Sequence, residues 1–389
     1  MATDALINTY GTRQLTLLKG EGSFVWDINN KRYLDAIAGI AVCGLGHSHP
    51  AVTEAISKQA ATLIHTSNLY NLPAQENLAN KLRQVSGMDK MFFGNSGAEA
   101  NEAAIKLARL HGTNKGIQNP TIVVMTSAFH GRTMATLTAT ANPKVQKGYG
   151  PLVQGFVRAP FGDADAVAQL ITNNPEIVAV MLEPIQGEGG IHVPPNDYLQ
   201  KLRKICSDNN VLLILDEIQT GNGRTGKYFA YQHAGIVPDI VTTAKGLGNG
   251  MPIGVCMTSG EASELMQPGS HGSTFGGNPL ACTVGLAVIE AMEKENLIER
   301  AAQMGEHLIQ RFRDTLANCL HVSEVRGKGM MIGIELERPC TELVAAAAAK
   351  GLLITVTAEK VIRLLPPLNL SDDEAELLVT TLTEVIEGF

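Results

Sequence analysis

Continuous apolar runs alternate with amphipathic stretches along much of the chain. Two stretches with helical periodicity, Asp163–Asn174 and Asp197–Asn209, lie between such runs. Each run is of strand length and apolar at consecutive positions, which is typical of strands covered on both faces. The alternation predicts a mostly parallel α/β sheet. The runs are Thr121–Met125, Ile177–Leu182, Val211–Leu215, Ile240–Ala244 and Gly254–Ser259.

The hydrophobic pattern of the remaining segments predicts further strands and helices and divides the chain into two domains. Strands are predicted at Ser23–Asp27, Lys31–Leu34, Lys90–Phe93, Gly329–Glu337 and Val361–Leu365. Helices are predicted at residues 51–64, at Ala74–Val85, after Ser96, from Asn278 towards residue 318 with a break near Glu295–Glu299, at Thr341–Lys350 and at Ser371–Glu387. The change of pattern near residue 290 predicts a large domain at 49–290 and a small domain at 291–389, joined by the N-terminal segment 1–48.

Composition limits the kinds of partner. The 389 residues carry a net charge of −7 and no basic run, which argues against a nucleic-acid surface. No apolar run approaches the roughly 18–20 residues of a membrane span, and the first residues lack the pattern of a secretory signal. Six scattered cysteines without a CxxC motif favour free thiols in a reducing compartment, so we expect the cytoplasm. We expect no metal site, and we interpret His47 and His49 as loop structure rather than metal ligands.

The candidate chemistry begins at the ends of two predicted strands. Asp216 follows Val211–Leu215 directly, and Lys245 follows Ile240–Ala244. In helix-covered sheets, ligands bind at the carboxyl ends of the strands. An acid that keeps a ring nitrogen protonated and an amine that binds an aldehyde covalently are the two groups that pyridoxal 5'-phosphate (PLP) chemistry needs.

Other polar groups follow neighbouring strands. The turn before the helix at Ser96 could hold a phosphate through backbone N–H groups, although Ser96 and Glu99 also fit a plain capping box. Phe129 could stack on a flat cofactor or belong to the core. Arg132 could bind a carboxylate or be a solvated loop residue. Glu188 lies in the segment after Ile177–Leu182. These alternatives stay open on the residues alone.

The motifs together resemble one family. GLGHSHP, NSGAEANEAAIKLAR, FHGRT, EPIQGEGG, LDEIQTGNGRTGK, PDIVTTAKGLGNGMPIG and HGSTFGGNP stand in the order found in class III aminotransferases of PLP fold type I, and most resemble the acetylornithine aminotransferase group. The resemblance implies a large domain with a mostly parallel seven-stranded sheet and a smaller α+β domain. Because Lys245 and Asp216 are both present, a PLP-fold binding or regulatory protein without activity is the weaker alternative.

The resemblance implies roles around the cofactor. Lys245 would bind it covalently and then move the proton at the reacting carbon. Asp216 would keep the ring nitrogen protonated, and Gln219 would reach the ring hydroxyl side. Phe129 would stack on the ring. The phosphate would be held by Ser96, Gly97 and Ala98 and by Thr274 of a second subunit, which implies a homodimer with shared active sites.

The resemblance also implies a substrate set. Arg363 would bind the α-carboxylate of glutamate, and Glu188 would mask Arg363 while a long ω-amine donor is bound. Arg132 would hold the far carboxylate of acetylornithine or 2-oxoglutarate, and Ser273 could touch the substrate. The implied reaction transfers the ω-amino group of N2-acetyl-L-ornithine to 2-oxoglutarate, a step of arginine biosynthesis.

Two positions depart from the family or refine the implied substrate. Cys43 stands where acetylornithine enzymes often have asparagine, which leaves the fine specificity open. Ile40 stands where ornithine aminotransferases carry a tyrosine that meets a free α-amine, which favours an acylated ornithine. Succinylornithine, N-succinyl-diaminopimelate, ornithine and 4-aminobutyrate remain alternative donors, and a mutase remains an alternative activity.

Overall fold

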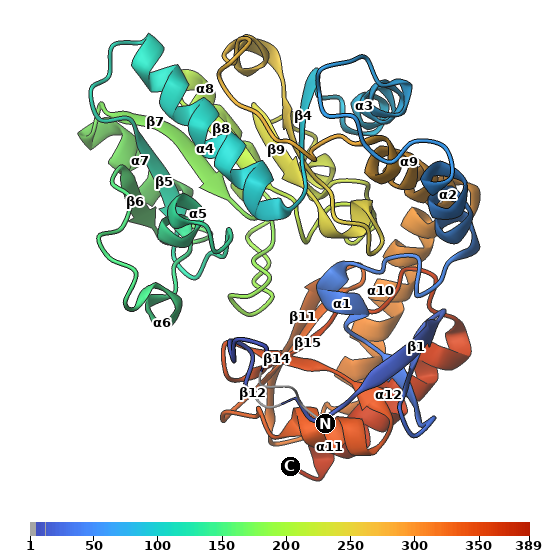
Figure 1. Cartoon of the computed structure of the whole chain (residues 1–389). Helices are drawn as coiled ribbons and strands as arrows, with labels where there is room; N and C mark the ends of the chain where they lie inside the picture. Colours follow the sequence, from blue (N-terminus) through green and yellow to red (C-terminus); the bar gives the residue numbers. More distant parts are fainter. Residues whose placement is uncertain (1–4, 12) are drawn as a thin grey trace.

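The larger part of the molecule is built on one seven-stranded sheet, and the computed structural model describes residues 5–11 and 13–389. The strand order is β4-β10-β9-β8-β7-β5-β6 (Figure 1). All pairs are parallel except those that β10 makes with β4 and β9. The predicted mostly parallel sheet is therefore confirmed. The strands are β4 Lys90–Gly94, β5 Thr121–Met125, β6 Phe156–Ala159, β7 Ile177–Leu182, β8 Leu212–Asp216, β9 Ile240–Thr243 and β10 Gly254–Thr258.

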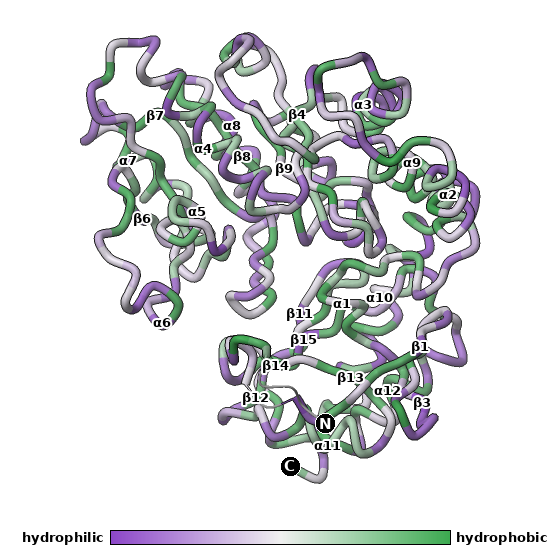
Figure 2. Tube along the Cα trace, in the orientation of Figure 1, coloured by the Kyte–Doolittle hydropathy of each residue, from purple (hydrophilic) through white to green (hydrophobic). Residues whose placement is uncertain are grey.

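Helices cover both faces of this sheet. Ile122 and Val124 of β5 pack with α4, whereas Val123 and Met125 pack with α7 and α8, because successive side chains of a strand point to opposite faces. Figure 2 shows the hydrophobic colouring along β7 and β8 between the two helical layers. The helices are α4 Gly97–Asn114, α5 Met134–Ala139, α6 Pro143–Gln146, α7 Ala164–Asn173 and α8 Tyr198–Asp208.

Two consecutive helices lead from the large sheet to the rest of the chain. α9 (Pro279–Lys294) packs against α2 (Pro50–Ala60) and α3 (Pro73–Ser86), and α10 spans Leu297–Thr315. Asn296 separates α9 from α10 with a φ of 53°, which confirms the predicted break. A left-handed residue cannot continue a right-handed helix, so the chain changes direction there.

The smaller domain contains two four-stranded sheets, in the orders β11-β12-β15-β14 and β1-β2-β3-β13. The second sheet joins N-terminal strands to β13, which runs parallel to β3. The predicted capping box at Ser371 and Glu374 is confirmed at the start of α12. The boundaries 1–48, 49–290 and 291–389 stay predictions, and residues 1–4 lie outside the described ranges. The elements are β1 Leu17–Glu21, β2 Phe24–Asp27, β3 Arg32–Asp35, β11 Val322–Lys328, β12 Met331–Leu336, α11 Leu343–Ala349, β13 Leu352–Leu353, β14 Thr355–Thr357, β15 Val361–Leu364 and α12 Asp372–Glu387.

The strands that sequence reasoning missed are mostly edge strands. β1, β6, β11 and β14 each close one side of a sheet. Edge strands need not be apolar at every position, so their sequences lack the continuous runs of β7 or β8. β11 even carries Glu324 and Arg326 within it. The predicted helix at 51–64 also ends earlier, at Ala60.

The segment Ala38–Ala41 (α1) forms one left-handed turn. All four residues have positive φ, from 47° at Ala38 to 66° at Ile40. This conformation is costly for residues other than glycine and clusters at functional sites. The turn contacts η2 (Lys245–Leu247), the short 3₁₀ turn that begins with the candidate lysine.

Candidate functional site

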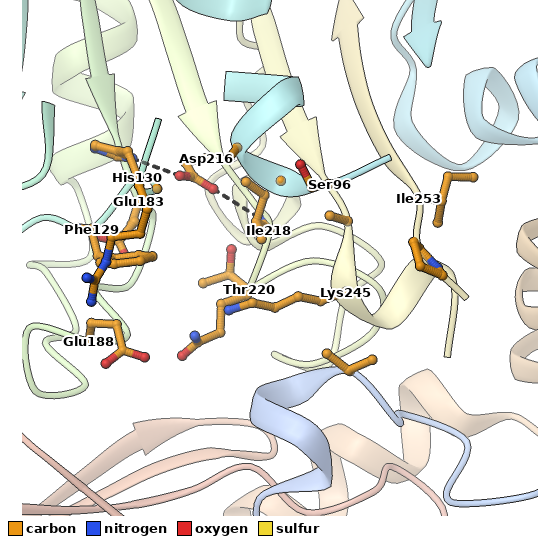
Figure 3. Close-up of a pocket in the computed structure, with 18 of the residues that line it drawn as sticks. Ser96, Phe129, His130, Glu183, Glu188, Asp216, Ile218, Thr220, Lys245 and Ile253 are labelled. Atoms are coloured by element: carbon orange, nitrogen blue, oxygen red, sulfur yellow. Dashed lines mark hydrogen bonds and ion pairs between the residues drawn. The ribbon is translucent and has the colours of Figure 1, made fainter. Parts of the chain in front are cut away.

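One cavity of about 400 Å³ lies where β5, β7, β8 and β9 end, a size typical of small-molecule sites. Nine of the twelve predicted site residues line it. Figure 3 shows Lys245 extending across the cavity towards the side on which Phe129 and Glu188 lie. The nine residues are Ser96, Gly97, Ala98, Phe129, Arg132, Glu188, Asp216, Gln219 and Lys245.

Asp216 and His130 form the floor of the pocket, and Asn101 and Thr242 support them from behind. All four residues are buried. Oδ2 of Asp216 pairs with Nδ1 of His130 at 2.7 Å (Figure 3). The same oxygen accepts a hydrogen bond from Nδ2 of Asn101 at 2.8 Å. Thr242 donates to Oδ1 of Asn101 at 2.7 Å, which fixes the amide. These partners hold the buried Asp216 carboxyl group in one orientation.

Lys245 has an unusual environment for a lysine. Among the described residues it makes no side-chain hydrogen bond or ion pair, and its φ is 43°. Burial, and after it the nearby positive charge of Arg363, lower the pKa of Lys245 to about 8. A partly neutral amine near neutral pH is the form that can attack an aldehyde.

The first turn of α4 faces the same cavity. Gly97 and Ala98 are the first residues of the helix, so their N–H groups have no acceptor within it. A Cβ on Gly97 would lie 2.7 Å from the Cδ1 of Ile218, so a larger residue there would force the Ile218 side chain to move. The predicted capping box is half formed. Ser96 Oγ accepts from the Glu99 N–H at 3.2 Å, but the Glu99 carboxylate accepts from the Asn95 N–H and the Ser96 hydroxyl instead of the Ser96 backbone N–H.

Glu183 joins two loops of the site. Its carboxylate accepts the Phe129 N–H and the Gly187 N–H, each at 3.0 Å. Burial raises the pKa of Glu183 to about 7. Phe129 and the loop that carries Glu188 are therefore held by the same side chain.

Two arginines offer binding places for carboxylates. Arg363, from β15, donates from Nη1 to Oε1 of Glu188 at 2.6 Å, and its side chain is only 3% exposed. Arg132 is exposed and stands over the Phe129 ring, with its guanidinium carbon 5.8 Å from the ring centroid. One guanidinium is thus paired with a carboxylate, and the other is open to the cavity. We call Glu188 and Arg363 the carboxylate gate.

The other predicted residues lie apart from the cavity lining. Ser273 Oγ accepts from Nδ2 of Asn95, which lines the cavity, at 3.2 Å. Thr274 is exposed and lines a second cavity, beside Asn68 and Leu69. Ile40, in the left-handed segment, does not line the main cavity. Val42, the residue directly after this segment, does line it.

Comparison with known proteins agrees with this geometry. Residues 8–386 match the model of the family Aminotransferase class-III. The chain belongs to the class III aminotransferases. It is 54% identical to the acetylornithine aminotransferase of Nitrosomonas europaea, over 99% of this chain and 98% of that one.

Solved class III structures share the fold. The ornithine aminotransferase of Toxoplasma gondii, in a structure described as having partial occupancy of PLP at its active site, matches with a TM-score of 0.94 and 32% identity over 97% of this chain and 92% of that one. The acetylornithine aminotransferase of Elizabethkingia anophelis matches with a TM-score of 0.88 and 33% identity, over 98% and 96%. Class III aminotransferases depend on PLP, and this is the cofactor of the chain.

The residues of the cavity fit that cofactor. Oε1 of Gln219 and Nε2 of His130 are buried and have no hydrogen-bond partner among residues 5–11 and 13–389. The open N–H groups of Gly97 and Ala98 suit a phosphate, and the free amine of Lys245 suits an aldehyde. The donor set therefore matches an anionic ring compound that carries an aldehyde.

Sequence reasoning missed the supports behind these residues. Asn101, Thr242 and Glu183 were given no role, and His130 was noted only as a neighbour of Phe129. A signal existed for Asn101, which is polar on the apolar side of a helix beside Ala100 and Ala104. Nothing in the chain pattern could reveal that Thr242 faces Asn101, because that contact depends on the packing of α4 against β9.

No helix in residues 5–11 and 13–389 is both long and apolar enough to cross a membrane. Over the same residues, no three His, Cys, Asp or Glu side chains are grouped so as to hold a metal ion. His47 pairs instead with Asp35 at 2.8 Å, and His49 with Glu295 at 3.2 Å.

Proposed function

We propose that this aminotransferase moves the ω-amino group of N2-acetyl-L-ornithine to 2-oxoglutarate, giving N-acetyl-L-glutamate 5-semialdehyde and L-glutamate. The observation that carries the proposal is the combination of an open Arg132 with the 2.6 Å pair of Glu188 and Arg363 around one lysine. One carboxylate receptor is available and the other is masked. This suits an enzyme that takes an acylated ω-amine and glutamate in turn. The relative from Nitrosomonas europaea, named acetylornithine aminotransferase, supports the choice of donor.

The residues divide the reaction between them. PLP, when bound, supplies an aldehyde for the amino group and a ring that delocalises the electron pair of the broken C–H bond. Lys245 would hold it covalently and then take the proton from the carbon that bears the donor amine. Asp216 would keep a proton on the ring nitrogen, and Gln219 would bond the ring hydroxyl.

The carboxylates of the substrates would be bound at the edge of the pocket. Arg132 would hold the α-carboxylate of acetylornithine, or the far carboxylate of 2-oxoglutarate. When glutamate binds, its α-carboxylate would replace Glu188 on Arg363. Because Arg363 is almost fully buried, leaving it without an anion is costly, so one carboxylate must always face it.

A second candidate donor is succinylornithine. A cavity of about 380 Å³ adjoins the main one and shares Phe129, Arg132 and Glu188 with it. Its other walls come from the segment 140–145 and from residues 356–358, with apolar groups such as Val145 and Val356. This space is larger than an acetyl group requires, so a longer acyl group would fit.

A panel of half-reactions tests the proposal. The wild-type PLP enzyme is mixed separately with acetylornithine, succinylornithine, ornithine and 4-aminobutyrate, and the loss of the visible cofactor band is followed by stopped flow. We expect the largest kcat/KM for acetylornithine or succinylornithine. A higher value for ornithine or 4-aminobutyrate would overturn the proposed donor.

We also propose a homodimer whose active sites are shared. Thr274 is exposed and lies outside the Lys245 pocket, next to Leu69, Tyr70 and Phe275, whose exposed fractions are 80%, 70% and 61%. Large exposed apolar side chains in one region mark interaction surfaces. In a dimer that buries them, Thr274 would reach the phosphate of the partner subunit.

The test measures both the assembly state of the enzyme and its affinity for PLP. Thr274→Ala is expected to weaken PLP binding about tenfold, since one hydrogen bond to a charged group is lost, with the dimer intact in sedimentation. Thr113→Ala, an exposed threonine on α4, is the control. A monomeric wild-type enzyme, or unchanged PLP affinity in Thr274→Ala, would contradict the shared site.

The place of the enzyme in the cell is a further part of the proposal. All six cysteines are free thiols, including four that are buried. Free thiols are normal in a reducing compartment, and this supports the cytoplasm.

A further inference from the structure

The carboxylate of Glu188 sits on a short closed loop between the two domains. Gln186 and His192 pair with each other through two backbone hydrogen bonds of 3.1 Å, which close the segment 187–191. Inside the loop, the N–H groups of Gly190 and Ile191 both point to the Gly187 carbonyl, at 3.3 and 3.4 Å. We call residues 186–192 the gate loop.

One side chain of the smaller domain holds the far side of the gate loop. Arg326, on β11, donates to the Gly190 carbonyl from Nε at 3.2 Å and from Nη2 at 2.6 Å. Its Nε also donates to the Ile191 carbonyl at 2.9 Å. Arg326 is 8% exposed, and its remaining nitrogen pairs with Glu324 and Glu335, each at 2.6 Å. All of its functional atoms are therefore engaged in one arrangement.

The gate loop needs such support because its backbone is unfavourable. Ile191 has a φ of 54°, a conformation that is a true outlier for a β-branched residue. Its side chain packs on Gly333 of β12, where a Cβ would lie 2.9 Å from Cβ of Ile191. The contacts with Arg326 and Gly333 compensate a strained conformation that the loop would otherwise leave.

Contacts on the near side complete the support. Glu183 accepts the Gly187 N–H, and the Thr357 hydroxyl donates to the Glu188 carbonyl. The backbone on both sides of Glu188 is therefore fixed. Its side chain is 37% exposed and, within the described part of the chain, is held only by Arg363. The side chain can rotate while the loop stays in place.

We propose that Arg326 is a positioning residue for the carboxylate gate: by fixing the Gly190 and Ile191 carbonyls it holds Glu188 where it can mask Arg363. The inference rests on the proposed two-donor function. It adds that the masking of Arg363 by Glu188 depends on Arg326 of the smaller domain, a side chain that would touch neither substrate nor cofactor. Without the Arg326 hydrogen bonds, the gate loop relaxes, the Glu188–Arg363 pair is weakened, and Arg363 is more often free for the carboxylate of glutamate.

The experiment measures both half-reactions and one equilibrium binding in the PLP enzyme. Arg326→Met and Arg326→Lys are compared with wild type, because lysine keeps a cation for Glu324 and Glu335 but cannot donate in a fork. We expect the ratio of kcat/KM for glutamate to kcat/KM for acetylornithine to rise on the order of tenfold in both variants. We expect the Kd for glutarate, a dicarboxylate that cannot react, to fall by a similar factor in calorimetry.

Two controls separate positioning from general structure. Arg313→Met removes an arginine of the same domain that also donates to a backbone carbonyl, that of Val325, but does not contact the gate loop. It should leave the ratio and the glutarate Kd unchanged. In a Glu188→Gln background, adding Arg326→Met should change neither quantity further, because the anion to be positioned is already absent.

The possible outcomes distinguish this inference from the proposed function. If Glu188→Gln raises the ratio and Arg326→Met does not, the gate stands and the role of Arg326 is refuted. If Glu188→Gln itself leaves the ratio unchanged, the gate and the inference both fail. Equal losses in both half-reactions with a lower Tm, or wild-type behaviour of Arg326→Lys, would also refute positioning by the forked hydrogen bonds.

Discussion

The floor of the pocket and the carboxylate gate hold their charges in different ways. Asp216 is surrounded by donors from its own domain, and its partners His130 and Asn101 are almost fully buried. Arg363 has a single carboxylate partner, Glu188, which arrives from the other domain on the gate loop. The hydrogen bonds of the floor can form in one arrangement, whereas Arg363 of the gate can exchange one carboxylate partner for another. In the proposed function, the floor would therefore bind the cofactor, and the gate would select between substrates.

The strongest test of the pocket is the removal of its lysine amine. Lys245→Ala should reduce kcat on the order of 10⁴-fold or more and abolish the visible band of the lysine-bound cofactor, because no other described side chain in the cavity is a lysine. Absorbance spectra and steady-state rates measure both effects, and Lys204→Ala, an exposed lysine on α8, is the control. An active Lys245→Ala enzyme would refute the assignment.

Asp216 should show the next largest effect. Asp216→Ala removes the carboxylate that would hold a proton on the ring nitrogen. It also removes the partner of Nδ1 of the buried His130, whereas Asn101 keeps its hydrogen bonds with the His130 carbonyl and with Thr242. We expect kcat to fall on the order of 10²- to 10³-fold, the range seen when one electrostatic group of a site is lost. An unchanged kcat, measured at saturating PLP, would contradict the role.

A smaller effect is expected from pH. Because the pKa of Lys245 is lowered to about 8, its amine is protonated below that pH and neutral above it. The rate at which the apoenzyme captures PLP should therefore rise about tenfold per pH unit below pH 8 and level off above it. The ordinary pKa of lysine is 10.5. A rate that continues to rise up to that pH would show that burial does not lower the pKa of the Lys245 amine.

The two regions also differ in how far sequence could predict them. Asp216 and Lys245 follow continuous apolar strands, so the residues at the strand ends could be placed together before the structure was known. The same reasoning could not place Arg326. It lies on the edge strand β11, whose charged residues interrupt the apolar pattern that predicts a buried strand. Thr242 and Asn101 were missed for a related reason. Their contact joins a helix to a strand 141 positions away, and only the packed fold brings them together.

The fold itself was largely predictable. The buried strands of the large sheet and the break between α9 and α10 follow from apolar runs and helix-ending residues. The left-handed turn at Ala38–Ala41 was not predictable, since only one of its four residues is glycine. Strain of this kind is stabilised by tertiary contacts, and a local pattern does not contain them.

The most direct test of a pocket that serves two donors through one gate is a pair of single-turnover measurements on Arg363→Ala. With glutamate, the half-reaction should slow on the order of 100-fold, because the receptor of its α-carboxylate is gone. With acetylornithine, which would be held by Arg132, the loss should be no more than a few-fold. Equal losses with both donors would contradict the gate, and with it the claim that Glu188 and Arg363 select between the substrates.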